Sequence, residues 1–448
     1  MEQFVYNLYN VLNIGWDIVV NWWWVPLPFI LLGSGKRVGS FLFMWLWWRR
    51  ELWLNDQKKV LLEIKIPTEV LKPLRSMEQV FSAIWGNLYD PPDKWEKWVE
   101  GKLMQCMQLE MVSLGGESHL YIRLDDARRK AVEASIYSEY PDAELSVVND
   151  YTKYVPQSIP NKEWEMWGTD YELVKPDVYP IKTYPKFFEE RPEIAKEEKR
   201  IDPMATLLEG MAVFKPGENL WIQLEAKPIA STKDWYNYDF VSVGRTIADK
   251  LAKRPEKSKQ KSILAEAAEE LATGKVPGEE EEKEEPIIPV EMRLTPGERD
   301  IIAGVEEKIG KRGFMCYLRF IYLAKRELYS GGAKAIPMGF FQQFATENLN
   351  QPKPWFYTLT KVKKSLWFLP NLIRERRLFV KKRRLFFRYV NRYEPLYPRP
   401  SKQGAFLFNT EELATIFHFP GRAVAAAPFV SRVESKKGEA PPGLPMEE

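Results

Sequence analysis

The stretch Leu61-Leu62-Glu63-Ile64-Lys65-Ile66 has the pattern from which the fold of this chain can be worked out. From position 62 onward its apolar residues alternate with charged ones, which is the period of a strand with one buried face. An amphipathic helix is predicted next, with a capping box at Ser76 and Gln79 and an end before the prolines at 91 and 92. The apolar face of this helix is Val80, Ile84 and Leu88.

A β-hairpin and a second helix follow. Leu109–Ser113 and His119–Leu124 have strand composition, and Gly115-Gly116 between them is a typical hairpin turn. A helix over Asp126–Tyr140 and a strand over Leu145–Val148 complete the order βαββαβ. That order is typical of the ferredoxin-like split βαβ unit, an antiparallel sheet with two helices on one face. We therefore predict a ferredoxin-like α+β domain over residues 55–155.

A second α+β domain is predicted in two parts, residues 156–253 and 291–350, separated by a disordered acidic linker over 254–290. The first part is expected to hold a strand near Tyr179–Tyr184, a helix capped by Asp202, a strand over Leu220–Lys227 and a helix over Trp235–Lys253. The second part is expected to hold a helix capped by Thr295 with Glu298, a strand over Phe314–Ala324 and a helix over Met338–Asn348. The linker is rich in glutamate, a composition that favours a solvated segment.

Residues 1–54 are rich in tryptophan and aliphatic residues and predict a membrane anchor. A membrane span needs roughly 20 mostly apolar residues, and Ile18–Leu32 has the right chemistry before the polar run Gly33–Arg37 interrupts it. One span followed by an interfacial helix and one longer kinked span both remain open. The residues expected at the membrane interface are Trp22, Trp23, Trp24, Trp47, Trp48, Arg49 and Arg50. Because the arginines mark the cytoplasmic side, the body is predicted to face the cytoplasm from the inner (plasma) membrane.

Composition excludes several classes of protein. The 448 residues have a net charge of +3, so any case for nucleic acid must rest on local clusters of charge. There are two cysteines, Cys106 and Cys316, and two histidines, His119 and His418. This excludes a disulfide framework and leaves little material for histidine metal sites or catalytic triads. We predict no catalytic residue, no metal and no cofactor, and therefore a protein that is not an enzyme.

One basic segment stands out within residues 351–400. Between Lys361 and Tyr393 there are twelve Lys or Arg against a single acid, Glu375, with aromatic residues interleaved. Such a mixture suits nucleic acid, because the cations neutralise phosphates and the aromatics stack on bases. A basic patch on anionic lipid and a helix with a buried aromatic stripe and a solvated or protein-binding face are the alternatives. The candidate binding residues are Arg374, Arg376, Arg377, Lys381, Lys382, Arg383, Arg384 and Arg388.

A short helix is predicted within residues 401–425, followed by a flexible tail over 426–448. Asn409 and Glu412 have the spacing of a capping box, and Pro420 ends the helix. His418 is therefore expected at the negative end of the helix dipole as a structural residue.

Several strings together resemble a known family. They are Leu61-Leu62-Glu63-Ile64-Lys65-Ile66-Pro67, Met77-Glu78-Gln79-Val80-Phe81, Tyr140-Pro141-Asp142-Ala143-Glu144, Arg200-Ile201-Asp202-Pro203 and Asn409-Thr410-Glu411-Glu412-Leu413-Ala414. They are similar to an uncharacterised membrane-attached domain family of candidate-phyla bacteria linked to conjugation-type secretion ATPases. The region from Asn409 also resembles the stretch that precedes the motor domain in HerA/FtsK-like and type IV secretion ATPases.

This resemblance implies a membrane-anchored, non-catalytic component of a DNA translocation or conjugation-type system, docking a motor ATPase that is a separate chain. The sequence has no Walker motif of its own. A membrane-bound DNA-binding protein that uses residues 361–393 is the alternative, and an enzyme with a site built from scattered residues is a third. A homo-oligomer is compatible with each of them.

Overall fold

The computed structural model describes residues 35–66, 72–187, 202–230, 239–252, 294–364, 373–393 and 404–420. It divides into two compact units, residues 1–58 with 91–103 and residues 59–90 with 104–448. The predicted acidic linker, the flexible tail and Trp22, Trp23 and Trp24 lie outside the described residues.

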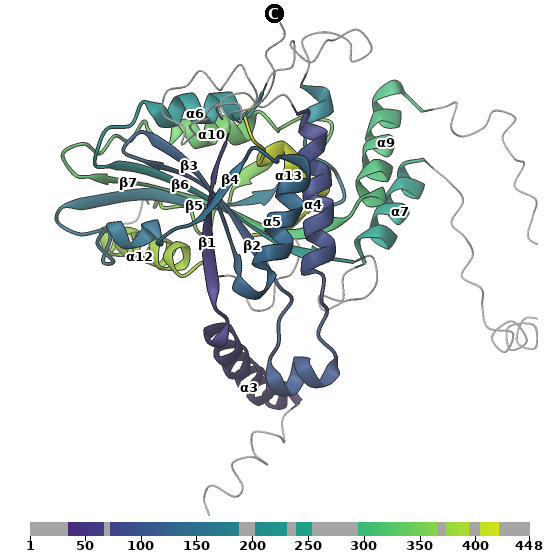
Figure 1. Cartoon of the computed structure of the whole chain (residues 1–448), viewed down its shortest axis with the longest axis horizontal. Coiled ribbons are helices and arrows are strands. Elements are labelled where there is room, and N and C mark those ends of the chain that lie inside the picture. The colour runs from purple at the N-terminus through teal and green to yellow at the C-terminus, as the bar shows by residue number, and fades with distance from the viewer. Residues whose placement is uncertain are drawn as a thin grey trace, which may run out of the picture. The chain divides into compact units, whose positions relative to one another are not determined.

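A nine-stranded antiparallel sheet forms the centre of the larger unit (Figure 1). Its strand order is β4-β1-β3-β2-β6-β7-β5-β8, and β9 pairs with β7. The strands are β1 (Lys59–Lys65), β2 (Met107–Leu114), β3 (Glu117–Asp125), β4 (Glu144–Val147), β5 (Trp164–Leu173), β6 (Glu218–Ile229), β7 (Gly313–Lys325), β8 (Pro352–Pro354) and β9 (Ala405–Asn409). The predicted α+β class with an antiparallel sheet is confirmed.

The first half of the sheet follows the predicted order β1, α4 (Leu74–Leu88), β2, β3, α5 (Arg129–Glu139), β4. Gly115 and Gly116 form the hairpin turn with φ of 64° and 103°, a region that glycine enters without strain. The predicted capping box of α4 is wrong. Helix α4 begins directly after Pro73, and the Ser76 backbone N–H donates to the Pro73 carbonyl oxygen at 2.9 Å, so Ser76 already lies inside the first turn.

The second half repeats this arrangement. Its order is β5, α6 (Met204–Ala212), β6, α7 (Phe240–Leu251), α9 (Pro296–Gly310), β7, α10 (Ala335–Gln342), β8. Strands β8-β5-β7-β6 lie in the same relative order as β4-β1-β3-β2, and the two halves meet where β2 pairs with β6. The sheet is therefore continuous across the domain boundary predicted at residue 155.

Two predictions about the second half are corrected. The stretch Tyr179–Tyr184 is not a strand, because it is part of a proline-rich loop ending in a 3-10 turn, η4 (Tyr184–Lys186), and proline cannot donate to a sheet. The first strand of this half is β5, which begins at Trp164, fifteen residues before Tyr179. The last helix, α10, begins and ends earlier than predicted. The capping box of Thr295 and Glu298 on α9 is confirmed.

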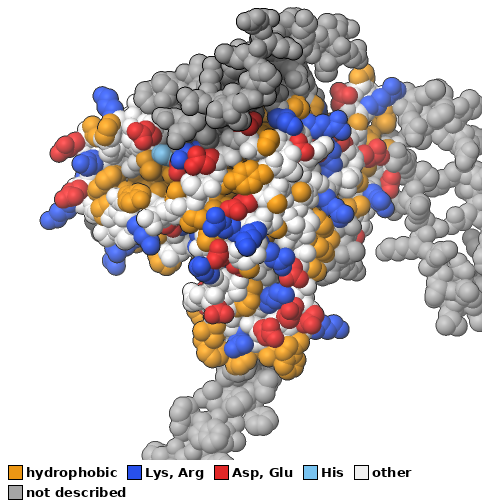
Figure 2. Space-filling model, in the orientation of Figure 1, with side chains coloured by type: hydrophobic (Ala, Val, Ile, Leu, Met, Phe, Trp, Pro, Cys, Tyr) orange, Lys and Arg blue, Asp and Glu red, His pale blue; other side chains and the backbone are white. Residues whose placement is uncertain are grey.

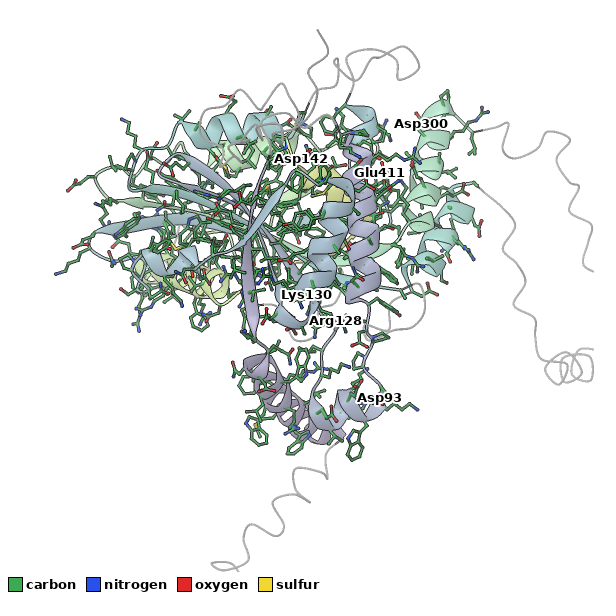
Figure 3. All side chains as sticks on the ribbon, in the orientation of Figure 1. Asp93, Arg128, Lys130, Asp142, Asp300 and Glu411 are labelled. Carbon is green, nitrogen blue, oxygen red and sulfur yellow. The ribbon has the colours of Figure 1, made fainter. Side chains whose placement is uncertain are left out.

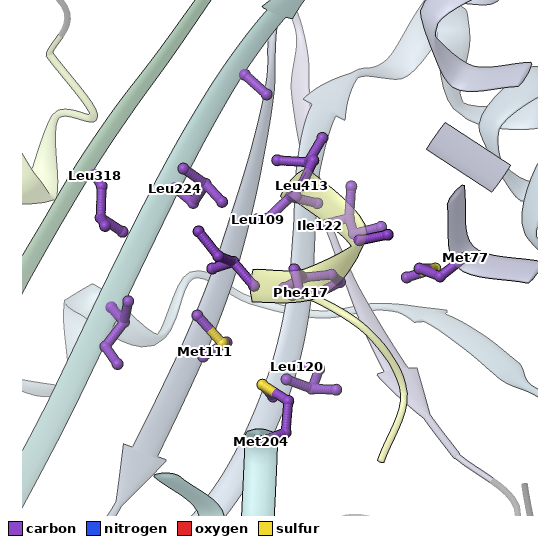
Figure 4. Packing of buried hydrophobic residues seen from close by; sticks show 14 of the residues in the cluster. Met77, Leu109, Met111, Leu120, Ile122, Met204, Leu224, Leu318, Leu413 and Phe417 are labelled. Carbon is purple, nitrogen blue, oxygen red and sulfur yellow. The ribbon is translucent and has the colours of Figure 1, made fainter. Parts of the chain in front are cut away.

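Both faces of the sheet are covered. Leu109 and Met111 of β2 point to one face, where α4, α5, α6, α10 and α13 (Thr410–Ile416) contribute to the largest apolar cluster. Figure 4 shows Met77 of α4, Met204 of α6, and Leu413 and Phe417 at α13 around the strands. The next residue of β2, Val112, points to the opposite face, where α12 (Arg374–Val390) packs. Helix α12 therefore lies on the face of the sheet opposite to α4, α5, α6, α10 and α13.

The smaller unit contains α3 (Gly35–Asp56) and a π-helical turn, η1 (Glu96–Glu100). Helix α3 continues through Arg49 and Arg50 as one helix, and the polar residues Gly35–Arg37 form its first turn. Arg50 is buried, and Nε of Arg49 donates to the Val99 carbonyl oxygen at 2.6 Å. Within the ranges that the structure describes, no helix is both long and apolar enough to cross a membrane.

Candidate nucleic-acid interface

Helix α12 has one face buried against the sheet. Leu385, Phe386 and Tyr389 recur at helical spacing and join an apolar cluster with Val112 of β2 and Trp221 of β6. The rings of Trp221 and Tyr389 are 5.6 Å apart, and the hydroxyls of Tyr389 and Tyr151 lie 2.9 Å from each other. Burial raises the pKa of both tyrosines, so the two hydroxyls stay neutral and share a hydrogen bond.

The end of α12 is fixed by Arg392, which has φ of 48° and turns its side chain down to the sheet. Its Nε and Nη2 lie 2.8 and 3.1 Å from the two carboxylate oxygens of Glu110, and Nη1 lies 2.5 Å from Oδ2 of Asp150. Gln223 of β6 donates to Glu110 from its Nε2 at 2.8 Å. We call Arg392, Glu110, Asp150 and Gln223 the Arg392 cluster. It joins the end of α12 to both halves of the sheet.

Electrostatics favour this arrangement. Burial raises the pKa of Asp150. The hydrogen bonds and charge interaction with Arg392 and the hydrogen bonds with Thr152 together outweigh this effect, so the pKa lies below its usual range. Glu110 is fully buried and accepts two hydrogen bonds from Arg392, a two-pronged geometry that is strong between a guanidinium and a carboxylate. The carboxylates therefore hold Arg392 in place as a charged group.

Further contacts hold α12 along its length. Nζ of Lys382 lies 2.8 Å from Oε1 of Glu165, and Nη2 of Arg388 lies 2.9 Å from Oδ2 of Asp170. Buried Arg319 of β7 donates to the carbonyl oxygens of Arg388 at 2.9 Å and of Tyr393 at 3.0 Å. Those carbonyls belong to the last turn and its exit, where backbone oxygens have no partner within the helix.

The opposite face of α12 is exposed and basic. Arg376, Arg377, Arg383 and Arg384 are all exposed. Because Val380 and Phe387 follow Arg376 at four and eleven residues, they lie on the same side, and Phe387 is 61% exposed. The exposed face of α12 is thus Arg376, Arg377, Val380, Arg383, Arg384 and Phe387. It combines four cations with apolar surface.

An aromatic loop adjoins this helix. Nζ of Lys381 lies 5.5 Å from the ring centre of Phe356 and 3.5 Å from the Phe356 carbonyl oxygen. Phe356 is 62% exposed and its neighbour Tyr357 is 74% exposed. Burial, followed by the charge of Arg377, lowers the pKa of Lys381. The sequence run Trp355-Phe356-Tyr357 is the signal for these residues, which lie before the window that sequence reasoning selected.

The eight basic residues predicted for binding divide into two groups. Lys382 and Arg388 are in ion pairs with the sheet, and Lys381 and Arg374 are half-buried. Arg376, Arg377, Arg383 and Arg384 are on the exposed face of α12. The sequence predicted a basic segment, and the structure shows that residues 374–390 of it form a helix with an apolar face buried and four arginines in solvent.

Both histidines have structural partners. Nδ1 of His119 lies 2.7 Å from Oε1 of Glu63. His418 is buried just after α13, with Nδ1 3.0 Å from the Ala414 carbonyl oxygen and Nε2 2.9 Å from Oδ1 of Asp202. The predicted helix-end histidine and the capping box of Asn409 and Glu412 before it are confirmed.

Comparison with models of known families gives no match, and comparison with curated proteins gives none. The geometry of α12 therefore has to be interpreted by its chemistry. Exposed guanidinium groups bind phosphate through paired N–H donors, and exposed aromatic rings offer flat faces to unpaired bases. A polymer with both phosphates and exposed bases is the class of ligand that could contact the guanidinium groups and the aromatic rings together.

Proposed function

We propose that this chain is a membrane-attached, non-catalytic component of a DNA translocation system and that the exposed face of α12 holds the DNA. The observation that carries the proposal is the group of four exposed arginines on a helix fixed to the sheet by its opposite face. A rigid support lowers the conformational entropy lost on binding, because the helix is already positioned. Phe356, Tyr357 and Phe387 favour single strands, whose bases are free to stack.

We further infer that each half of the sheet is a ferredoxin-like split βαβ unit. The support is the repeated strand order on either side of the β2–β6 pair. In that arrangement α12 lies outside both repeats and shares an apolar cluster with residues of both, among them Val112 in the first and Ile321 in the second. A helix added to a duplicated scaffold is a suitable place for a binding function.

Attachment to the membrane and a separate motor ATPase belong to the same proposal. They are supported by the sequence resemblance and by the tryptophan-rich first 54 residues. Purification of the tagged protein from detergent-solubilised membranes is expected to recover a motor ATPase with it. Repeated purification without an ATPase would contradict this part of the proposal and leave DNA binding to be judged by itself.

DNA binding is tested by fluorescence anisotropy with a labelled single-stranded oligonucleotide. The variant Arg376→Gln/Arg377→Gln/Arg383→Gln/Arg384→Gln should lose most of the affinity, because it removes the phosphate partners and leaves the buried face of α12 intact. The matched control removes four exposed cations elsewhere, Lys130→Gln/Lys153→Gln/Lys215→Gln/Arg245→Gln. Lys130 lies on α5 (Figure 3).

The control has the same net charge as the test variant, so it separates a local site from general attraction. Equal loss in both variants would contradict the proposed site. If the test variant keeps its DNA affinity but loses binding to vesicles of anionic lipid, α12 is a lipid-binding element and the DNA proposal fails.

A further inference from the structure

The smaller unit carries exposed tryptophans from two parts of the chain. Trp45, Trp47 and Trp48 are exposed on α3. Trp95 and Trp98 are 65% and 49% exposed on the segment 91–103, which connects α4 to β2. Figure 2 shows hydrophobic side chains gathered on the surface of α3 and η1. Single exposed apolar residues are ordinary, but a group of large ones marks an interaction surface.

The segment 91–103 is held firmly to α3. Gly101 has φ of 77°, and a Cβ there would lie 2.6 Å from the backbone carbon of Arg49, so the two backbones touch. The hydrogen bond from Arg49 to Val99 joins them a second time. The two tryptophans of the segment are therefore part of one small structure with α3.

The turn that presents these tryptophans is also well braced. Asp93 and Glu96 each accept a hydrogen bond from the other's backbone N–H, at 2.8 and 3.0 Å, and Nζ of Lys102 lies 2.9 Å from Oε1 of Glu96 (Figure 3 labels Asp93). Trp95 and Trp98 are three residues apart in this turn, and both side chains are exposed. A braced turn with two exposed tryptophans is suited to binding.

We propose that the segment 91–103 is a second lipid-contacting element, in which Trp95 and Trp98 enter the headgroup region of a bilayer beside the tryptophans of α3. This inference rests on the membrane attachment in the proposed function and extends it to residues outside the first 54. The bilayer is favoured over a protein partner by the residue type. Tryptophan is enriched at the membrane interface, where its ring is half in hydrocarbon and its N–H reaches water.

Two further observations favour lipid. The exposed tryptophans of α3 follow the apolar stretch Ile18–Leu32 in sequence. Insertion of that stretch into a membrane would therefore bring the tryptophans close to the membrane surface. Lys94 and Lys97 are next to Trp95 and Trp98, where an ammonium group can meet a headgroup phosphate. The segment as a whole has no net charge, because Asp93, Glu96 and Glu100 balance its three lysines. Lys97 lies 6.0 Å from the ring centre of Trp98, so it shares the same surface.

The test places a probe next to these residues in the full-length protein. Lys94 is exposed, and a Lys94→Cys variant accepts an environment-sensitive fluorophore, whereas the native Cys106 and Cys316 are buried. The protein is reconstituted into vesicles of phosphatidylcholine and phosphatidylglycerol, with and without lipids that carry a shallow acyl-chain quencher. We expect a blue shift of the probe and its quenching by the labelled lipid.

A matched variant, Lys94→Cys/Trp95→Ser/Trp98→Ser, should lose both the shift and the quenching. A probe at Lys215→Cys, exposed in the larger unit, is expected to show neither in either background. The inference is overturned if the Lys94 probe is not quenched while a probe at Trp48→Cys is quenched. It is equally overturned if quenching persists without the two tryptophans, or if a blue shift occurs without quenching by lipid.

Failure of the proposed membrane attachment gives a different result. In that case the unlabelled protein does not float with vesicles, and probes at positions 48 and 94 are both silent. DNA binding by α12 is measured separately and does not depend on either outcome.

Discussion

The guanidinium of Arg392 meets the buried carboxylate of Glu110 with two hydrogen bonds, of 2.8 and 3.1 Å, across a sequence separation of 282 residues. Glu110 lies in the middle of β2, and Arg392 lies just beyond the end of α12. The pair joins the helix that carries the candidate site to the strand at which the two halves of the sheet meet. It therefore ties the end of α12 to the junction of the two halves.

Replacing Arg392 by methionine should lower the free energy of unfolding by about 3–5 kcal/mol, because Glu110 is left as a buried charge without its cation. Urea unfolding followed by circular dichroism measures the change. Arg384→Met is the control, since its side chain is exposed on the same helix and a surface substitution changes stability by only about 0.5 kcal/mol. Equal effects of the two substitutions would show that the Arg392 cluster does not hold the helix.

Asp150 gives the stability a dependence on pH. Its pKa is lowered in the folded protein, so the ionised form stabilises the fold at neutral pH, above the unfolded pKa of about 3.9. This contribution is lost as the pH falls through the folded pKa. In urea titrations, the stability difference between wild type and Asp150→Asn should be largest near pH 7 and should narrow at acid pH. Asp142→Asn, on an exposed turn, should show no such narrowing.

The packing of β5 against β7 and α12 leaves no room for a side chain at Gly168. A Cβ there would lie 2.5 Å from the Phe320 carbonyl oxygen and 3.0 Å from Cδ2 of Leu385. Gly168→Ala should therefore destabilise the protein by about 1–3 kcal/mol, the usual cost of overpacking. Gly86→Ala, in α4 with no atom within 4 Å of the new Cβ, should instead stabilise it by about 0.5–1 kcal/mol. Thermal unfolding compares the two, and stabilisation by both would contradict the close packing of β7 and α12 around Gly168.

Local patterns predicted much of the fold. The hairpin around Gly115-Gly116 and the capping boxes at Thr295 and Asn409 depend on neighbouring residues, and the structure confirms them. Strand β5 was missed because Gly168 and Asp170 break its apolar run, and its stability comes from partners far along the chain. Long-range pairing between β2 and β6 has no signature in the sequence of either strand.

The sequence predicted the location of the candidate site but not which of its side chains face solvent. Clustering of charge identified the basic segment, since it is a local property of residues 361–393. Which arginines face solvent depends on the buried side of the helix, and that side is fixed by Glu110, Asp170 and Glu165 on distant strands. Phe356 and Tyr357 lie outside that window in sequence, and the fold brings their loop against Lys381 of α12.

Aromatic stacking separates single-stranded DNA from other anionic ligands. Phe356→Ala and Tyr357→Ala should each weaken binding of a single-stranded oligonucleotide by about 1–3 kcal/mol, the usual contribution of one stacked base. Tyr154→Ala, at an exposed position 70% open to solvent, should leave the affinity unchanged. Anisotropy titrations measure all three. If the first two variants bind like wild type, bases do not stack on this loop.

The central claim is that four exposed arginines of α12 contact DNA phosphates, and its most direct test is the salt dependence of binding. For single strands the slope of log K against log [salt] is about −0.7 for each phosphate neutralised. We predict that replacing Arg376, Arg377, Arg383 and Arg384 by glutamine makes the slope shallower by about 2.8, which is four phosphates at that value. The control variant of Lys130, Lys153, Lys215 and Arg245 should keep the wild-type slope. An unchanged slope in the α12 variant, or an equal change in the control, would contradict the account.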